Sequence, residues 1–219
     1  RGRHTSRARA NGDRPRIGGQ RLITLGVDQG KYSYYVVCEW FVDQMANDIN
    51  IAARCKVLAF GKFLEDDWHI LRELMREWQV LACVIDADPQ INEARRFAKE
   101  FPGYVYLSRY RRGKTAKEIG LSEVGSGAPL ATVDRTNWLT ASLGRFRTKR
   151  ITLPRDISLE FREHVKALVR TYEPDETGNP VATFVDTGPD HYAHALTYAE
   201  IALPLAASIT TGKNVEKFL

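Results

Sequence analysis

Long apolar runs and paired cysteines are both scarce in this chain of 219 residues. No apolar run approaches the ~20 residues that a membrane helix requires, and the first residues lack the apolar core of a signal peptide. The three cysteines, Cys38, Cys55 and Cys83, lie singly in apolar runs and do not have the spacing of a metal-binding knuckle. We expect them to be buried free thiols in a reducing cytoplasm.

Acidic side chains are nearly absent from the first 20 residues, which hold six arginines and one aspartate. These residues account for the whole formal net charge of +5, because the other 199 residues carry equal numbers of basic and acidic side chains. Residues 1–20 also have almost no apolar content, so we expect a disordered basic tail or linker before one domain over residues 21–219. An arm that binds nucleic acid and an expression leftover are the alternatives for the tail.

The hydrophobic pattern of the domain predicts a mixed α/β fold. Three early runs rich in tyrosine, valine and tryptophan predict neighbouring antiparallel strands. Two later strands alternate with helices and are expected to be parallel, with right-handed crossovers. The expected order is strand, strand, strand, helix, strand, helix and strand, at residues 21–28, 32–42, 53–63, 65–78, 80–86, 89–101 and 103–110.

The second half of the chain is less regular. Residues 111–133 contain several glycines and predict a long loop or an irregular hairpin. Helices are expected at residues 135–146 and 157–172, and a short strand at residues 180–186. A final helix is expected to begin within residues 189–206.

Three aspartates occupy the ends of predicted elements. Asp28 ends the first strand in GVDQG, and Asp86 ends the buried strand VLACVID. If these strands are neighbours, two carboxylates meet at one sheet edge with no evident internal cation. That arrangement is costly for stability and normal for hard oxygen ligands of a divalent metal. Asp190 is a third acid, at the start of the last helix, where the helix dipole favours an anion.

Ordinary structural roles are also open to these acids. Asp28 could form a turn, Asp86 an Asx-type cap and Asp190 a helix N-cap.

The residues beside the aspartates have interpretations of their own. Asp88, before a proline, is the better capping candidate near the buried strand, and His191 can orient a ligand or a water. His194 and Tyr198 are expected to pack on a helix face.

This order of elements, with its three acids, resembles the ribonuclease H-like nuclease fold. Over residues 21–205 the chain resembles, more narrowly, the nuclease domain of the large terminase subunit of tailed bacteriophages. The segments that carry the resemblance are GVDQG, VIDADPQINEARRFAKEFPG, VDRTNWLTASLGRFRTKRITLP and DHYAHALTYAEIAL. It implies a mixed sheet of three antiparallel strands followed by parallel strands, flanked by helices.

The resemblance implies a metal-dependent endonuclease that cuts double-stranded, concatemeric viral DNA during genome packaging. Asp28, Asp86 and Asp190 would be its catalytic residues and would hold two Mg²⁺ or Mn²⁺ ions, with Asp28 bridging both, for two-metal hydrolysis. His191 and Asp88 would be auxiliary. The enzyme would work in the host cytoplasm as part of the packaging motor and would be absent from the mature virion.

Two acid-free basic segments, residues 109–117 and 145–155, would hold the DNA backbone without reading bases. Each could instead be a solvated loop. The expected DNA-binding residues are Arg109, Arg111, Arg112, Lys114, Lys117, Arg145, Arg147 and Lys149.

The partners that the resemblance implies are an upstream packaging ATPase domain, the portal protein and the small terminase subunit, with no membrane. Ser108 stands where a phosphate-loop glycine would be needed before Gly113, so the chain resembles an isolated nuclease domain.

Three other functions compete with a terminase nuclease. A Holliday-junction resolvase or a transposase-like enzyme would share the fold. An actin-like ATPase or kinase fragment is suggested by GVDQG alone. A non-catalytic DNA-binding adaptor that keeps the fold is the third.

Overall fold

The computed structural model describes residues 20–42, 53–64, 66–111, 119–124, 127–174 and 176–212. The expected disorder of residues 1–20 therefore lies outside the described residues, except that Gln20 already belongs to the first strand. Within the described part of the chain, no helix combines the length and apolarity needed to cross a membrane.

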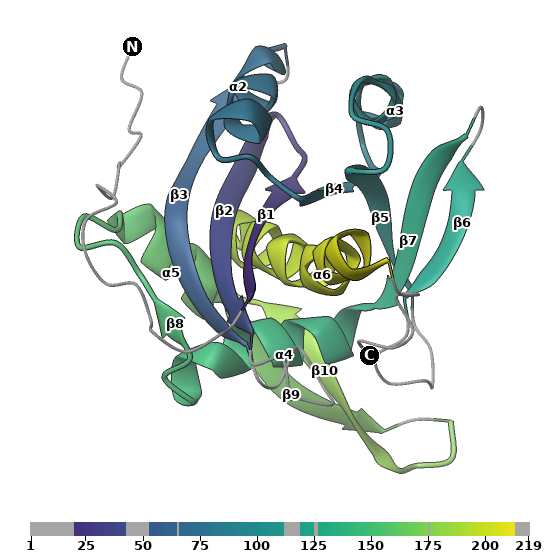
Figure 1. Cartoon of the computed structure of the whole chain (residues 1–219). Helices are drawn as coiled ribbons and strands as arrows, with labels where there is room; N and C mark the ends of the chain where they lie inside the picture. The colour runs from purple at the N-terminus through teal and green to yellow at the C-terminus, as the bar shows by residue number, and fades with distance from the viewer. Residues whose placement is uncertain are drawn as a thin grey trace.

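An eight-stranded mixed sheet forms the centre of the molecule, in the order β6-β7-β5-β4-β1-β2-β3-β8 (Figure 1). A separate two-stranded sheet pairs β9 with β10. The strands are β1 Gln20–Asp28, β2 Tyr32–Val42, β3 Arg54–Leu64, β4 Ala82–Asp86, β5 Val105–Arg111, β6 Gly120–Val124, β7 Ala128–Asp134, β8 Ile151–Thr152, β9 Leu168–Pro174 and β10 Pro180–Asp186.

Strand pairing confirms the predicted mixed sheet. β1, β2 and β3 are antiparallel neighbours, whereas β4 runs parallel to β1 and β5 runs parallel to β4. The ribonuclease H-like arrangement expected from the sequence is therefore present, with β1 and β4 side by side in the middle of the sheet. β7 extends the parallel part beyond β5.

Helices cover both faces of the sheet (Figure 1). α2 and α3 share one hydrophobic cluster with one face, and α4, α5 and α6 share another with the opposite face. The helices are α2 His69–Glu77, α3 Ile91–Glu100, α4 Arg135–Arg147, α5 Leu159–Ala167 and α6 His191–Thr211.

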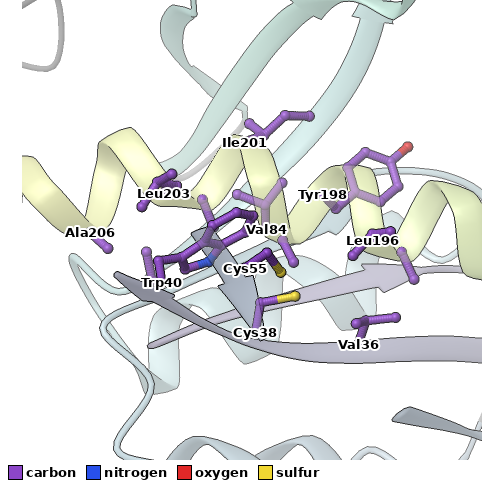
Figure 2. Packing of buried hydrophobic residues seen from close by; sticks show 14 of the residues in the cluster. Val36, Cys38, Trp40, Cys55, Val84, Leu196, Tyr198, Ile201, Leu203 and Ala206 are labelled. Atoms are coloured by element: carbon purple, nitrogen blue, oxygen red, sulfur yellow. The ribbon is translucent and has the colours of Figure 1, made fainter. Parts of the chain in front are cut away.

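α6 is buried over most of its length because it lies directly on the sheet. Thr24 of β1 donates a hydrogen bond to the carbonyl oxygen of Ala199, at 2.8 Å. Gly26 lets the two backbones approach, since a Cβ there would lie 1.9 Å from the carbonyl oxygen of Ala195. Figure 2 shows Val36 and Trp40 of β2 packed under Leu196 and the rest of α6. A helix that is apolar on most sides, as α6 is, needs such cover.

All three cysteines are buried and unpaired, as the sequence predicts. Cys38 and Cys55 lie in the α6-side cluster (Figure 2), and Cys83 lies in the cluster on the other face.

The helix predicted at residues 65–78 begins later than expected. α2 starts at His69, and its first turn contains no acid. The amide of Asp67 donates to the carbonyl oxygen of Leu64 at 2.9 Å, which makes a turn between β3 and the helix. Asp66 and Asp67, which the predicted bounds included in the helix, lie before it.

The helix predicted at residues 157–172 was wrong in its second half. α5 ends at Ala167, and β9 begins at the next residue. Val169 pairs with Val185 and Thr171 pairs with Thr183, so β-branched residues face each other across a hairpin. Pairing with the predicted strand at 180–186 supplies partners that a longer helix could not.

The hairpin alternative for residues 111–133 is confirmed in the part that is described. β6 and β7 pair antiparallel, with Gly120 opposite Thr132 and Glu123 opposite Pro129. Residues 112–118 lie outside the described residues.

Candidate active site

Asp28 and Asp86 lie at the same edge of the sheet. Val27 pairs with Ile85 in the parallel register of β1 and β4, so the two strands deliver their next residues, both aspartates, side by side. Asp28 is only 6% exposed. Val27 and Ile85 belong to the cluster on the α2–α3 face, so alternation along the strands turns Asp28 and Asp86 toward the face that α6 covers. The predicted placement of two carboxylates at one edge of the sheet is confirmed.

The pKa of the Asp86 carboxyl group is raised by its surroundings. Burial, and then the negative charge of Asp28, raise the pKa of Asp86 to about 6. The backbone amide of Asp88 donates to Oδ1 of Asp86 at 3.3 Å and opposes part of this rise. Asp86 therefore does take the Asx-type contact considered for it, and remains unfavourably ionised at neutral pH.

His191 is the basic group nearest to Asp28. Nδ1 of His191 lies 2.9 Å from Oδ2 of Asp28, and its ring stacks on Tyr34 with 4.7 Å between centroids. The hydrogen bond to Asp28 raises the pKa of His191, and the charge of Asp190 raises it further. The expectation that neither acid has an internal cation was therefore wrong for Asp28, because the first residue of α6 supplies one when protonated.

Asp190 sits at the N-cap position of α6 but makes no side-chain cap. Its Oδ2 lies 3.1 Å from Nε2 of His194 instead. Burial raises the pKa of Asp190, yet this hydrogen bond and the nearby charges of His194 and His191 bring it below the ordinary value. The alternative that Asp190 is a helix N-cap is thus correct for its position in the chain, but its side chain does not make the hydrogen bond of an N-cap.

A cluster of buried hydroxyl groups surrounds the two strand-end aspartates. Tyr110 of β5 contacts Nδ1 of His194 at 3.0 Å and stacks on Tyr198 at a centroid distance of 5.4 Å. Ser108 pairs in register with Asp86. The hydroxyls of Ser108 and Tyr198 are buried and make no hydrogen bond of ordinary geometry with the described residues.

These oxygen atoms bear on whether a divalent metal fits. Two adjacent carboxylates and two hydroxyls without partners are hard donors of the kind that Mg²⁺ and Mn²⁺ prefer. However, among the described residues no group of three or more His, Cys, Asp or Glu side chains is arranged to hold a metal ion. Asp28 and Asp86 fit as a pair, whereas Asp190 faces His194.

Gln29 was not singled out in the sequence, although it follows Asp28 directly. Its Nε2 donates to the carbonyl oxygen of Asp86 at 2.5 Å, and its Oε1 accepts from the amide of Gln90 at 3.2 Å. It ties the ends of β1 and β4 to the start of α3. A glutamine side chain directly after an aspartate that ends a strand is the sequence feature that could have indicated this link between the strands and α3.

His194, Tyr198 and Tyr110 contribute more than was expected of them. His194 and Tyr198 were expected to pack on a helix face, and Tyr110 was given no role. Instead, His194 contacts Asp190, and the Tyr110 hydroxyl contacts His194 across 84 positions of sequence, with the Tyr198 ring stacked on Tyr110. When a tyrosine or histidine lies on an otherwise apolar face of a strand or helix, the sequence does not indicate which group its hydroxyl or ring nitrogen will contact.

One of the predicted DNA-binding residues lies inside the fold rather than on its surface. Arg145 is 4% exposed and bonds both oxygens of the Glu200 carboxylate, at 2.6 and 2.5 Å. Its assignment to DNA was therefore wrong, since a buried, paired guanidinium does not reach a phosphate. Arg147 and Lys149 are exposed.

The other basic segment gives a similar picture. Arg109 is exposed but paired with Asp88 at 2.9 Å, and Arg111 is half-buried at the end of β5. Among the described residues, Asp88 reaches the site through its backbone amide, which donates to Asp86, and its auxiliary role stays a prediction. Arg112, Lys114 and Lys117 lie outside the described residues.

Known proteins resemble this chain in fold. No family model and no curated protein matches the sequence. A crystal structure of the large terminase nuclease from thermophilic phage G20c with bound magnesium is 14% identical, with a TM-score of 0.47 over 82% of this chain and 80% of that one. The large terminase nuclease domain of Thermus phage P74-26 is also 14% identical, with a TM-score of 0.46 over 82% and 78%. At these values a functional conclusion depends on the side chains.

A groove of about 690 Å³ lies between α4, α5, β9 and β10. None of the aspartates described above lines it. Its floor includes Leu143, Phe146 and Val165, which bear no group able to carry out hydrolysis. The candidate active site is therefore the carboxylate edge of the large sheet.

Proposed function

We propose that this chain is a metal-dependent nuclease that hydrolyses phosphodiester bonds in DNA. The single observation that carries the proposal is the pair of adjacent carboxylates at the ends of β1 and β4, of which Asp28 is buried and Asp86 is half-buried with its pKa raised to about 6. No lysine or arginine of the described residues forms an ion pair with either of them. A divalent cation would offset the repulsion that this pair creates.

Each residue of the site would have a definite part. Asp28 and Asp86 would hold the cations, with Asp28 best placed to bridge them, and Asp190 would supply a third carboxylate from α6. When bound, two Mg²⁺ or Mn²⁺ ions would supply an activated water and stabilise the leaving 3′ oxygen. His191, which contacts Asp28, would orient the attacking water.

The substrate we propose is double-stranded, concatemeric viral DNA cut during genome packaging, as in a terminase large subunit. Support comes from the segments around Asp28, Asp86 and Asp190 that resemble this family. The exposed Arg147 and Lys149 would contact phosphates. An upstream ATPase domain, the portal protein and the small terminase subunit would be the partners, in the host cytoplasm.

Cleavage of supercoiled plasmid tests the proposal. The chain would be incubated with Mn²⁺, Mg²⁺ or a chelator, and nicked and linear products would be separated on a gel. We expect cutting with either metal and none with chelator. Asp28→Asn should lower the rate at least about 100-fold, since each 1.36 kcal/mol of lost transition-state stabilisation is a factor of ten.

Asp156→Asn is the matched control, because Asp156 is an exposed acid outside the site. Its cutting should equal that of the original chain. Undiminished cutting by Asp28→Asn would remove Asp28 from the mechanism. A strong preference for four-way junctions over plasmid would instead favour a resolvase.

A further inference from the structure

We propose that the groove between α4, α5, β9 and β10 is a docking site for an acidic amphipathic helix of a partner protein. None of the aspartates at the carboxylate edge lines this groove, so the inference goes beyond the proposed nuclease function and does not depend on it. It rests on an apolar floor, a rim whose charged side chains are all basic, and an exposed tyrosine beside the rim.

The floor of the groove is apolar and only partly covered by the chain itself. Several apolar side chains of its lining are half-buried, namely Leu143, Phe146, Leu153, Ile157 and Val165. They pack against buried clusters on one side and face the groove, of about 690 Å³, on the other. Folded proteins rarely leave a large contiguous apolar surface open to water unless something binds there.

Every charged side chain that lines the groove is a cation. Arg162 and Lys166 belong to α5, Arg170 belongs to β9, and Arg147 lies at the end of α4. All four are exposed, and within the described part of the chain no acid forms an ion pair with them. Arg147 is the cation proposed above to contact DNA, so the inference uses the other three. A ligand that carries carboxylates would be attracted to this rim.

Tyr172 extends the apolar surface beyond the rim. It lies two residues after Arg170 on β9, so its side chain points to the same side of the hairpin. Tyr172 is 62% exposed, and the guanidinium carbon of Arg170 lies 5.5 Å from the centre of its ring. Tyrosine and arginine are two of the residue types that contribute most binding energy at protein interfaces. This combination favours a protein partner.

A helix suits the groove better than an extended peptide does. The apolar side chains of an amphipathic helix lie on one face, at positions such as i, i+4 and i+7, and the residues that flank them point sideways. Glutamates at the flanking positions would reach the cations of the rim while the apolar face fills the floor. In a strand, alternate side chains point to opposite faces, so the acids would point away from the groove. Duplex DNA would offer phosphates to the rim but little apolar surface to the floor.

Binding of designed peptides to the whole chain tests the inference. A fluorescein-labelled helical peptide of about 15 residues would carry leucines at i, i+4 and i+7 and glutamates on both flanks. A basic counterpart has lysines in place of the glutamates, and a polar counterpart has glutamines in place of the leucines. By fluorescence anisotropy we expect the acidic peptide to bind at least about 10-fold more tightly than either counterpart. Absence of binding, or a counterpart that binds equally well, would overturn the inference.

Two exposed residues of the groove test where the peptide binds. Lys166→Glu should weaken binding at least about 10-fold, because it sets a carboxylate against the carboxylates of the peptide. Its matched control is Lys99→Glu, the same change at an exposed lysine of α3, on the opposite face of the sheet. Tyr172→Ala should weaken binding about 10-fold, and Tyr104→Ala, at an exposed tyrosine outside the groove, should not. Equal losses in a variant and its control would contradict docking in this groove.

Two further measurements distinguish other occupants of the groove. A DNA duplex that displaces the peptide, and whose own binding falls with Lys166→Glu, would assign the groove to DNA and overturn the inference. A dimer in analytical ultracentrifugation that Tyr172→Ala dissociates would assign the groove to a second copy of this chain and would overturn it as well. Plasmid cutting by Lys166→Glu should equal that of the original chain. A chain that binds the acidic peptide in the groove but does not cut DNA would support the inference and refute the proposed function alone.

Discussion

Asp86 is a carboxyl group in surroundings that oppose its charge. Burial and the neighbouring Asp28 raise its pKa from 3.8 to about 6. Between these values the folded protein binds more protons than the unfolded chain does, so the free energy of unfolding falls as pH rises through this window. The carboxyl group is least costly when protonated, and its penalty is fully present above pH 6.

Asp86→Asn should therefore stabilise the metal-free protein at pH 8. The expected gain in the free energy of unfolding is about 1–3 kcal/mol, since one pKa unit corresponds to about 1.4 kcal/mol. Urea denaturation at pH 8 and near pH 4, with chelator present, measures it. The gain should vanish near pH 4, where the carboxyl group is protonated in the fold. A variant less stable than the original chain at pH 8 would contradict this account.

Arg145 differs from Asp86 because its charge is buried together with that of an oppositely charged partner, Glu200. Arg145→Ala would leave Glu200 ionised and buried, which we expect to cost about 3–5 kcal/mol of stability. Replacing both residues, as Arg145→Met with Glu200→Leu, should restore most of it. Urea denaturation of the three proteins measures this, with Arg147→Ala as a surface control that should stay within about 0.5 kcal/mol.

At the scale of elements, the contact between β1 and α6 decides whether the site forms. α6 brings His191, His194 and Asp190 to the strand ends only because Gly26 has no side chain under it. Among the described elements α6 comes last along the chain and β1 comes first, so the site forms only when these two distant segments pack together.

Gly26→Ala should displace α6 and destabilise the protein. Its Cβ would lie 1.9 Å from the carbonyl oxygen of Ala195 and 2.2 Å from the amide nitrogen of Ala199, both backbone atoms that cannot move aside. Overpacking of a core typically costs about 1–3 kcal/mol, and we expect the upper end or more here. Thermal unfolding followed by circular dichroism tests this.

Gly144→Ala is the matched control within a helix. A Cβ at Gly144 meets nothing within 4 Å, so alanine should stabilise α4 by up to about 1 kcal/mol. Equal effects of the two substitutions would show that the close approach at Gly26 is not a constraint.

At the scale of the whole molecule, basic composition says less about DNA binding than it first suggests. The surplus of positive charge comes from residues 1–20, and within the domain Arg145 and Arg109 are already paired. Arg147, Lys149 and Arg150 are exposed at and just after the end of α4, and the first two are the cations proposed to contact DNA.

Removal of either cation should weaken the salt dependence of DNA binding. Arg147→Ala and Lys149→Ala should each reduce the slope of log K against log salt concentration by about 0.9, the value for one phosphate contact on duplex DNA. Fluorescence anisotropy with labelled duplex at several salt concentrations measures the slope. Arg155→Ala, at an exposed cation of the same segment, serves as the comparison. An unchanged slope in all three variants would place DNA elsewhere on the surface.

The sequence alone determined the first five strands of the large sheet and the positions of Asp28 and Asp86 at the ends of two of them, whereas β7 and β8 joined the sheet without being predicted there. Both predictions follow from local properties, namely the period of apolar residues and the rule that neighbouring parallel strands end at the same edge. The apolar runs around the cysteines were equally local, and their burial was predicted.

Only the tertiary structure decided which side chains meet. His191 contacts Asp28 across 163 positions of sequence, and Arg145 bonds Glu200 across 55. The end of α5 at Ala167 depended likewise on a hairpin partner further along the chain. Such pairings arise only when distant segments pack. For this reason Arg145 was predicted from the sequence to contact DNA, whereas in the fold it forms a buried ion pair with Glu200.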